Sequence, residues 1–347
     1  MQQVVVSGAR PAQGRDWTSR GETRPVYGAL DLGTNNCRLL MAVPAGQGFK
    51  VVDAFSRTTR LGEGLAHSGI LSMEAMDRTL SVLKMCAHRM ERRGVTRFRS
   101  VATEACRRAE NCAEFITLVR DETRLEMEII SAEEEARLAL AGCAALLDRR
   151  LPDALVFDIG GGSTELMHVK VGNRRGSEEI VAMASIPLGV VTLAEARGKV
   201  LHTPRGYADT VDEVCDQLMR VDRDGGLARL TELDRIQMLG TSGTVTTLAG
   251  VHLRLPRYDR SQVDGLVMTF EEIDAVSSLL VEARAEERAA HPCIGQERAD
   301  LVVAGCAILD AICRLWPAGR LRVADRGVRE GLLMSLMRAD RARAAAE

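Results

Sequence analysis

One pattern occurs twice in this 347-residue sequence and constrains its fold more than any other feature. In each copy an apolar run reaches an aspartate, passes through a glycine-containing turn and continues into a second apolar run. The first copy spans residues 26–43, with Asp31 before the turn, and the second spans residues 155–171, with Asp158 in the same place. Such runs predict β-hairpins. The duplication predicts an α/β fold with two similar lobes that face a shared cleft.

The length of the chain supports the same division, because 347 residues exceed the size at which a single hydrophobic core stops growing. Apolar residues make up 46% of the chain, as in ordinary globular proteins. We expect the first domain at residues 27–138 together with 325–340, and the second at residues 139–324, with a hinge near the helix that follows Ser131. The segment 1–26 has no apolar run long enough for a signal peptide, which predicts a disordered tail.

Hydrophobic periodicity predicts the other elements. The expected helices are residues 72–93, 111–120, 131–147, 273–290, 297–315 and 331–338, with a frayed tail from Ala339. Further strands are expected at residues 49–54, 98–103, 125–130, 236–239 and 320–324. Ser131 followed by Glu134 predicts a capping box, in which the side chain of each residue bonds the backbone of the other.

Composition argues against several classes of partner. The formal net charge is −2 and aromatic residues make up 3% of the chain, which argues against nucleic acid. No apolar run approaches the roughly 20 residues needed to cross a bilayer, so no membrane partner is expected. The 9 cysteines form an odd set without C-x-x-C spacing, and the 6 histidines show no metal-ligand spacing. Free thiols in a reducing cytoplasm are the favoured interpretation.

The glycine turns are candidate phosphate sites, because backbone N–H groups can converge on an anion where no Cβ blocks the approach. Neither turn has P-loop spacing, and neither opens a helix as a dinucleotide-binding turn does. A hairpin that wraps around phosphate is the remaining interpretation. The candidate residues of the first turn are Asp31, Gly33, Thr34, Asn35 and Asn36, and those of the second are Gly160, Gly161, Gly162, Ser163 and Thr164.

Acidic residues near the second turn indicate a metal site. Asp158 and Glu165 form a natural magnesium pair, since Mg²⁺ prefers oxygen ligands and bridges to phosphates. The alternative for Glu165 is a solvated strand position. Within the run of glutamates at 133–135, the capping role of Glu134 leaves Glu135 as the candidate general base, and service to the helix dipole is the alternative. Arg107 is suited to clamping a phosphate, with an ordinary surface arginine as the alternative.

Several stretches of the chain together resemble the exopolyphosphatase and guanosine pentaphosphate phosphatase family, a branch of the superfamily of actin, sugar kinases and Hsp70. The stretches are ALDLGTNNCRLL from Ala29, VATEACRRAEN from Val101, EIISAEEEARL from Glu128, VFDIGGGSTEL from Val156, LGTSGTVTTLAG from Leu239 and VADRGVREGLL from Val323. The resemblance covers about residues 27–334. It implies two actin-like, ribonuclease H-like domains around a central cleft. It also implies hydrolysis of the terminal phosphoanhydride of polyphosphate or guanosine pentaphosphate, with Mg²⁺ or Mn²⁺ as cofactor.

The resemblance also assigns individual residues. The family's catalytic glutamate falls on Glu135, its phosphate-contacting arginine on Arg107, and its metal-linked acids on Asp158 and Glu165. Its third phosphate motif falls on the loop that contains Gly240, Ser242, Gly243 and Thr244. Asn36 replaces the family's usual small hydroxyl residue, which puts one phosphate contact in doubt. Long members continue into a helical HD-type domain, so the resemblance here is to a short, two-domain member.

Two other functions stay open. A kinase of the same superfamily would share the glycine turns, although Arg107 and the stretch 131–138 favour hydrolysis. A nucleotide-binding regulator without turnover is disfavoured by the retained acidic residues. The basic positions expected near the cleft are Arg38, which we also count as phosphate-binding, Arg60, Arg107, Arg254, Arg257 and Arg260. Because these are few, short or medium polyphosphate or a nucleotide triphosphate is the expected substrate. The oligomeric state stays open, with a homodimer as one alternative.

Overall fold

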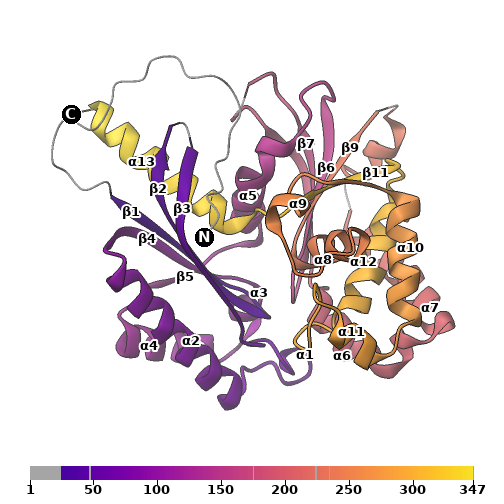
Figure 1. The fold of residues 1–347 in the computed structure, drawn as a ribbon, viewed down its shortest axis with the longest axis horizontal. Coiled ribbons are helices and arrows are strands. Elements are labelled where there is room, and N and C mark those ends of the chain that lie inside the picture. The colour runs from indigo at the N-terminus through magenta and orange to yellow at the C-terminus, as the bar shows by residue number, and fades with distance from the viewer. Residues whose placement is uncertain (1–24, 47, 175, 223–224, 234, 347) are drawn as a thin grey trace.

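Two mixed sheets stand side by side in the computed structural model, each with helices packed on it (Figure 1). The structure describes residues 25–46, 48–174, 176–222, 225–233 and 235–346. The tail expected at residues 1–26 therefore lies outside the described residues, except for its last two, and Val26 already begins the first strand. Within the described part of the chain, no helix is both long and apolar enough to cross a bilayer.

The first lobe is built on a five-stranded sheet with the order β3-β2-β1-β4-β5. Its strands are β1 (Val26–Leu32), β2 (Asn36–Ala45), β3 (Gly48–Thr58), β4 (Val95–Ala102) and β5 (Met127–Ile129). Its helices are α1 (Leu65–Ser68), α2 (Met73–Arg92), α3 (Glu104–Arg108) and α4 (Cys112–Thr123). Residues of α2 and α4, among them Leu83 and Phe115, share a core with Leu30 and Leu39 of the sheet. This core covers one face of the sheet.

The second lobe is built on a six-stranded sheet with the order β10-β11-β9-β6-β7-β8. Its strands are β6 (Asp153–Ile159), β7 (Thr164–Lys170), β8 (Glu179–Ile186), β9 (Gln237–Thr241), β10 (Val267–Thr269) and β11 (Arg320–Ala324). Its helices are α6 (Val190–Arg197), α7 (Pro204–Val221), α8 (Gly243–His252), α9 (Arg260–Val263), α10 (Phe270–Glu282), α11 (Ala285–Ala290) and α12 (Val302–Leu315), with short 3₁₀ turns at 144–146, 198–202 and 228–232. Apolar residues of α12 form the centre of its largest core.

The predicted duplication is present in both sheets, and with it the two-lobed actin-like fold. β1 and β2 form an antiparallel hairpin, as do β6 and β7. In each hairpin the first glycine of the turn donates its N–H to the carbonyl three residues later, from Gly33 to Asn36 and from Gly160 to Ser163, both at 2.9 Å. A parallel strand then flanks the first strand of each hairpin, β4 beside β1 and β9 beside β6.

Helix α5 (Ala132–Cys143) lies between the lobes, and helix α13 (Val328–Ala346) starts beside it and runs along the first sheet (Figure 1). Leu138 of α5 belongs to a core of the first lobe, whereas Leu140 belongs to a core of the second. The two helices touch closely, because a Cβ on Gly331 would lie 2.1 Å from the carbonyl oxygen of Leu138. The expected hinge near α5 stays a prediction, and any motion there has to accommodate the close packing of α5 on α13.

Several sequence-based element boundaries were wrong. The helix expected at 297–315 begins only at Val302, and the one expected at 273–290 is two helices separated at residues 283–284. The last helix begins at 328 and continues to 346 instead of fraying from Ala339, because tertiary contacts hold its end. Tyr27 donates a hydrogen bond to Asp340 at 2.9 Å, and Arg341 donates one to the carbonyl of Gly46 at 3.2 Å. Strands β8 and β10 and helices α6 and α7 were not predicted.

Candidate active site

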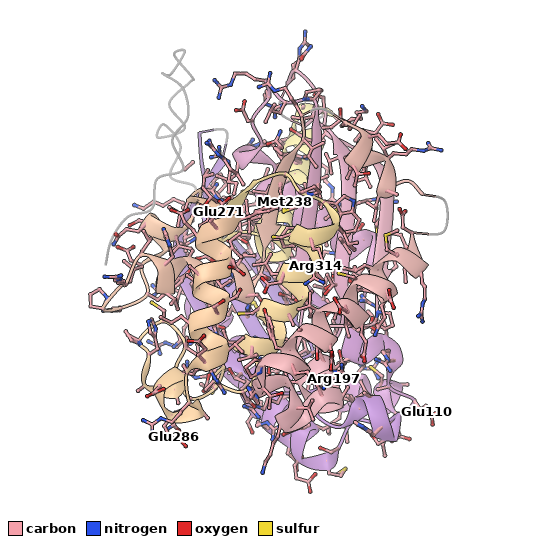
Figure 2. All side chains as sticks on the ribbon, turned by 90° about the vertical axis from the view of Figure 1, so that its right-hand side faces the viewer. Glu110, Arg197, Met238, Glu271, Glu286 and Arg314 are labelled. Carbon is pink, nitrogen blue, oxygen red and sulfur yellow. The ribbon has the colours of Figure 1, made fainter. Side chains whose placement is uncertain are left out.

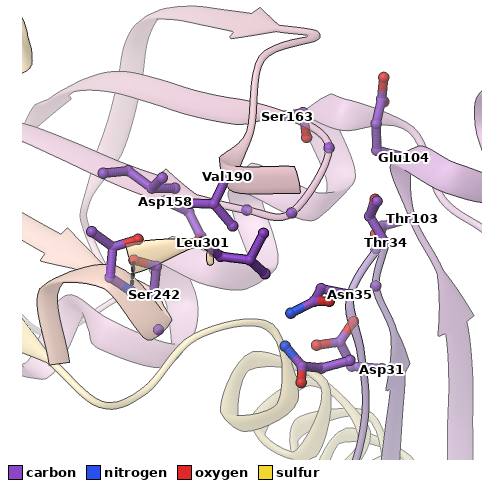
Figure 3. A pocket seen from close by; sticks show the side chains of 18 of the residues that line it. Asp31, Thr34, Asn35, Thr103, Glu104, Asp158, Ser163, Val190, Ser242 and Leu301 are labelled. Carbon is purple, nitrogen blue, oxygen red and sulfur yellow. Dashed lines mark hydrogen bonds between the residues drawn. The ribbon is translucent and has the colours of Figure 1, made fainter. Parts of the chain in front are cut away.

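A cavity of about 130 Å³ lies between the lobes, and both hairpin turns line it (Figure 3). Its volume is roughly ten times the 10–15 Å³ that a single water requires. From the first lobe and the helices beside it the lining residues are Asp31, Gly33, Thr34, Asn35, Asn36, Arg38, Thr103, Glu104, Glu135 and Val328. From the second lobe they are Asp158, Ile159, Gly160, Gly161, Gly162, Ser163, Val190, Ser242, Gly243, Thr244, Thr247, Arg298, Leu301 and Val302. Most of the predicted site residues are thus brought together.

The two turns meet across this cavity. A Cβ on Gly161 would lie 3.1 Å from the backbone nitrogen of Asn35, and a Cβ on Gly162 would lie 2.6 Å from Oγ1 of Thr34. Glycine is therefore needed here for close approach of the lobes, not for a positive φ. Thr34 Oγ1 and Asn35 Oδ1 are buried and have no hydrogen-bond partner within the described residues. Unsatisfied buried polar atoms of this kind are expected where a ligand completes the site.

A neighbouring segment holds the first turn in place. The backbone N–H groups of Thr59 and Arg60 donate to the carbonyl of Asn35 at 2.9 and 3.0 Å, and that of Gly62 donates to the carbonyl of Thr34 at 2.9 Å. Arg60 adopts a φ of 47°, which is unusual for a residue with a side chain. Its guanidinium crosses to the second lobe, where it lies 3.1 Å from Asp300. The arginine is therefore paired at the mouth of the cleft.

The third loop predicted to bind phosphate brings a helix N-terminus to the cavity. β9 ends in this loop and α8 begins at Gly243, with Ser242 at a φ of 144° and its Oγ accepting a hydrogen bond from the N–H of Thr244 at 3.1 Å. Free N–H groups and the helix dipole make such an end favourable for anions. Gly240 does not line the cavity. It packs against Phe157, where a Cβ would lie 2.6 Å from the ring.

Arg107 and Glu135 are in direct contact. Nη1 of Arg107 donates to Oε2 of Glu135 at 2.7 Å and to the carbonyl of Ile130 at 2.9 Å. Nε donates to Oε2 of Glu104 at 3.0 Å. Nη2 lies 2.9 Å from the same oxygen but at an angle unsuited to hydrogen bonding, so this buried nitrogen is left without a hydrogen-bond partner. Arg107 itself does not line the cavity, whereas both of its carboxylate partners do.

Glu134 serves a different purpose from its neighbour. Ser131 Oγ accepts a hydrogen bond from the N–H of Glu134 at 3.2 Å, as predicted. The reciprocal half of the capping box is absent, because the Glu134 carboxylate instead accepts from Arg99 at 3.1 Å. Glu134 is therefore engaged by a strand of the first sheet, and Glu135 is the glutamate of α5 that reaches the cavity.

Buried carboxyl groups give the site its electrostatic character. The pKa of Glu135 is raised well above its usual range, first by burial and then by repulsion from Glu165. The pKa of Asp158 is raised to about 7, first by burial and then by repulsion from Glu135. The pKa of Asp31 is also raised by burial, although Arg38 opposes the shift. The carboxyls repel one another because they share a region of low dielectric constant.

The carboxyl group of Glu165 adds to this repulsion from beneath the cavity surface. Its side chain is 1% exposed and does not line the cavity. Ser163 and Ser185 donate hydrogen bonds to its Oε1 at 2.7 and 3.0 Å. It stands directly opposite Asp158 in the β6–β7 register, so the two side chains lie on one face of the sheet. Burial and Asp158 raise the pKa of Glu165 to about 7.

Comparison with known proteins identifies relatives of the chain. Residues 40–340 match the model of the Ppx/GppA phosphatase family. The chain belongs to this family. It is 27% identical to the Aquifex aeolicus member of the family, for which a crystal structure is known. The match between the two structures covers 92% of this chain and 99% of that chain, with a TM-score of 0.73. An exopolyphosphatase-like protein is 26% identical, with a TM-score of 0.81 and coverages of 90% and 98%. An exopolyphosphatase from Cytophaga hutchinsonii, at 23% identity and a TM-score of 0.79, shares the fold.

The donor set of this Ppx/GppA phosphatase fits a magnesium ion. Asp158 and Glu135 line the cavity with raised pKa values, so a cation would relieve their repulsion. Across the described ranges there is no group of three or more His, Cys, Asp or Glu side chains arranged to hold a metal. Mg²⁺ does not require one, because it is commonly held by one or two carboxylates and completes its shell with water and phosphate oxygens.

Sequence reasoning missed several lining residues. Arg298 lies in the segment before α12 and contacts Thr247 Oγ1 at 3.4 Å. It falls within the stretch expected to be helical, where a single arginine gives no functional signal. Among the basic positions expected near the cleft, Arg38 lines the cavity, whereas Arg254 and Arg257 do not. Arg260 donates to Glu330 at 2.8 Å and is part of a structural network, not of a solvated loop.

Proposed function

We propose that this phosphatase is an exopolyphosphatase that hydrolyses the terminal phosphoanhydride of inorganic polyphosphate, with guanosine pentaphosphate as an alternative substrate. The observation that carries the proposal is the convergence on one cavity of three anion-binding backbone segments and the glutamate Glu135. The description of a relative at 26% identity as exopolyphosphatase-like supports the choice of substrate. The acidic residues make a purely regulatory role less favoured, since nucleotide binding alone does not call for a buried carboxylate cluster.

In this proposal the chain positions phosphates through its backbone and activates water through Glu135. N–H groups of the two glycine turns and of the α8 N-terminus would hold the phosphate chain, and Arg38 would balance its charge. Glu135 would accept the proton of the attacking water as the new P–O bond forms and the bridging P–O bond breaks, so the shortened chain leaves with the bond's electrons. A raised pKa suits this role near neutral pH. Such assistance contributes about 10²–10⁴-fold, and positioning with charge stabilisation supplies the rest.

Asp158 is the residue best placed to hold Mg²⁺, with Glu135 beside it and Glu165 behind it as a carboxylate oriented by two serines. The ion would neutralise phosphate oxygens that the acidic cavity otherwise repels. Arg107 would steer Glu135 and hold the terminal phosphoryl group, for which its guanidinium must turn toward the cavity, since it does not line the cavity in this structure although its Nη2 makes no hydrogen bond. Buried guanidinium N–H groups without partners are costly, so an arriving phosphate oxygen would stabilise the site.

The decisive test compares Glu135→Gln with Glu134→Gln, two adjacent glutamates of one helix. Glu135→Gln should lower turnover at least 10²-fold with little change in melting temperature, because the base is lost while packing is kept. Glu134→Gln weakens a partly exposed pair with Arg99 and should cost at most about 1 kcal/mol of stability, with near-normal activity. Loss of activity in Glu134→Gln but not in Glu135→Gln would overturn the assignment.

Substrate choice is tested by phosphate release from polyphosphates of defined length and from guanosine pentaphosphate, measured with and without a hydroxyl acceptor. A kinase would need the acceptor, whereas a hydrolase would not. We expect short and medium chains to be preferred, because Arg60 and Arg260 are already paired with carboxylates and extend no basic track. A ladder of intermediates on a gel would agree, and full-length polymer beside free phosphate with nothing between would show processive action.

A further inference from the structure

Glu104 holds one edge of the arginine that contacts the proposed general base. Both Nε and Nη2 of Arg107 lie within 3.0 Å of Oε2 of Glu104, whereas Nη1, on the other side of the guanidinium, contacts Glu135 at 2.7 Å. Glu104 is the first residue of α3 and Arg107 follows three positions later, so the two side chains emerge on the same face of a five-residue helix. Arg107 therefore joins two carboxylates, and Glu104 limits where its guanidinium can turn.

The position of Glu104 is unfavourable for an enzyme that binds polyanions. Its side chain is 14% exposed and lines the same cavity, where a carboxylate repels phosphate. Burying a charge is costly unless it is paired. Within the described chain, its side-chain hydrogen bond and its ion pair are both made with Arg107. The compensation for this buried charge therefore comes from Arg107, which points to a function exerted through the arginine.

Glu104 also lies close to the second lobe. A Cβ on Gly162, in the second glycine turn, would lie 3.1 Å from Cγ of Glu104. Figure 3 shows Glu104 beside Thr103, near the turn that carries Ser163. The methylene stem of Glu104 thus lies close to a glycine turn of one lobe while its carboxylate holds an arginine of the other. Separation of the two lobes would remove this proximity.

We infer that Glu104 is a positioning residue, which holds Arg107 in the orientation that contacts Glu135 and makes that orientation depend on the approach of the second-lobe turn. The inference rests on the proposed function of Glu135 and Arg107. A free arginine side chain samples many rotamers, so restraining it beforehand favours the reactive arrangement. A displacement of about 1 Å near the reacting atoms can lower a rate roughly 10²-fold.

The test uses Glu104→Ala, Glu104→Gln and Glu104→Asp. Glu104→Ala should lower kcat about 10–100-fold with KM changed by less than about threefold, since the group steers Arg107 and does not itself bind substrate. Glu104→Gln should be milder, because its amide oxygen can still accept from Nε. Glu104→Asp keeps the charge but is too short to reach Arg107, and it should resemble Glu104→Ala. The matched control is Glu128→Gln, which removes a glutamate–arginine pair with Arg99 away from the cavity.

A double-mutant cycle separates positioning from direct action. Adding Glu104→Ala to Arg107→Ala should produce no further loss of kcat, because the arginine through which Glu104 acts is gone. Multiplicative losses would overturn the inference. A lower KM in Glu104→Ala with kcat unchanged would also overturn it, since Glu104 would then act as an anion that competes with phosphate.

A crystal structure of Glu104→Ala tests the inference independently of any substrate. We expect Nη1 of Arg107 to leave Glu135, and persistence of the 2.7 Å contact would overturn the inference. If the wild-type protein released phosphate from no candidate substrate, the proposed function would fail, and this structural comparison would still decide whether Glu104 positions Arg107. The melting temperature of each variant shows whether loss of activity reflects loss of folding.

Discussion

The two glycine hairpins have similar backbone arrangements but carry different side-chain charges. In each, an aspartate is the second-last residue of the first strand and stands opposite the residue seven positions later, which is Arg38 for Asp31 and Glu165 for Asp158. The first hairpin therefore pairs an acid with a base, whereas the second pairs an acid with an acid. Burial raises the pKa of both aspartates and Arg38 opposes the shift at each, whereas Glu135 adds to the rise at Asp158. The two hairpins thus have the same backbone arrangement but differ in the charge of the residue that faces the aspartate.

This difference assigns a different task to each hairpin. The first hairpin contains its own cationic residue, Arg38, and can bind a phosphate without a metal ion. The second hairpin brings carboxylates together and favours phosphate binding only when a cation is bound, because like charges in a buried site repel strongly. The proposed magnesium site follows from this asymmetry. The same asymmetry can be tested by changing matched residues in the two copies.

The largest expected effect separates the two aspartates. Asp158→Asn should raise the Mg²⁺ concentration needed for half-maximal phosphate release by about 10–100-fold, as loss of a metal-linked carboxylate commonly does. Asp31→Asn should change this requirement much less, because Arg38 already faces Asp31. Magnesium titrations of the two variants are the measurement. Equal shifts would mean that the hairpins do not divide the work as described.

A smaller effect is expected for the cation of the first hairpin. Arg38→Gln should raise KM roughly tenfold or more, because a hydrogen bond to a charged group contributes about 1.5–3 kcal/mol. The magnesium requirement should stay the same. Arg57→Gln is a suitable control, since Arg57 lies one strand away, stacks on Phe55 at 4.9 Å and does not line the cavity. Equal KM changes in both variants would indicate a general effect of surface charge.

The matching glycines of the turns should differ in their tolerance of a methyl group. A Cβ on Gly160 would lie 2.9 Å from the carbonyl oxygen of Ser163, whereas a Cβ on Gly33 would lie 3.5 Å from that of Asn36, an ordinary contact. Gly160→Ala should therefore destabilise the protein by about 1–3 kcal/mol, as overpacking does. Gly33→Ala should be close to neutral. Thermal or urea unfolding of both variants checks the difference, and equal stability would contradict it.

The pH dependence of stability should report the carboxylates of the second hairpin. Their pKa values are raised on folding, so between the ordinary value near 4 and the Asp158 value of about 7 the folded chain binds more protons than the unfolded chain. Stability of the metal-free protein should therefore fall as pH rises through this window. The fall should be about 2 °C in melting temperature per excess proton and pH unit.

Two changes should flatten that profile. Asp158→Asn removes one titrating carboxyl, and saturating Mg²⁺ replaces the protons with a cation. Melting curves at several pH values, with and without Mg²⁺, supply the comparison. A metal-free profile that rises from pH 5 to 7 would show that the carboxylates are stabilised, not strained, by folding.

The sequence predicted features whose signals are local. Both hairpins and helix α2 follow from short runs of apolar residues, an aspartate and a glycine turn, or a serine cap, each of which acts within a few residues. The edge strands β8 and β10 were missed because β10 has only three residues and most residues of β8 are partly exposed, which leaves a weak alternation. Their existence depends on pairing with strands that are distant in sequence or already formed.

Within the site, the sequence predicted which residues line the cavity better than it predicted what they contact. Glu135 was separated from Glu134 by the expected cap and by the family resemblance, and in the structure Arg99 of strand β4 engages Glu134. The contact between Glu104 and Gly162 joins the two lobes, and no periodicity in the chain records it. Arg298 escaped notice for the same reason, because its approach to the cavity is a property of tertiary packing.

The placement of α13 has a consequence for the order in which the chain acquires its structure. Leu332 and Leu333 of this last helix complete the core around Tyr27 and Ala29 at the opposite end of the sequence. During synthesis that face of the first sheet stays uncovered until the final helix emerges. The strands of the second sheet, by contrast, all lie between residues 153 and 324. At about 5–20 residues per second, the roughly 200 residues between the two parts of the first lobe impose a delay of about 10–40 s, during which an apolar face is open to chaperones or to another chain.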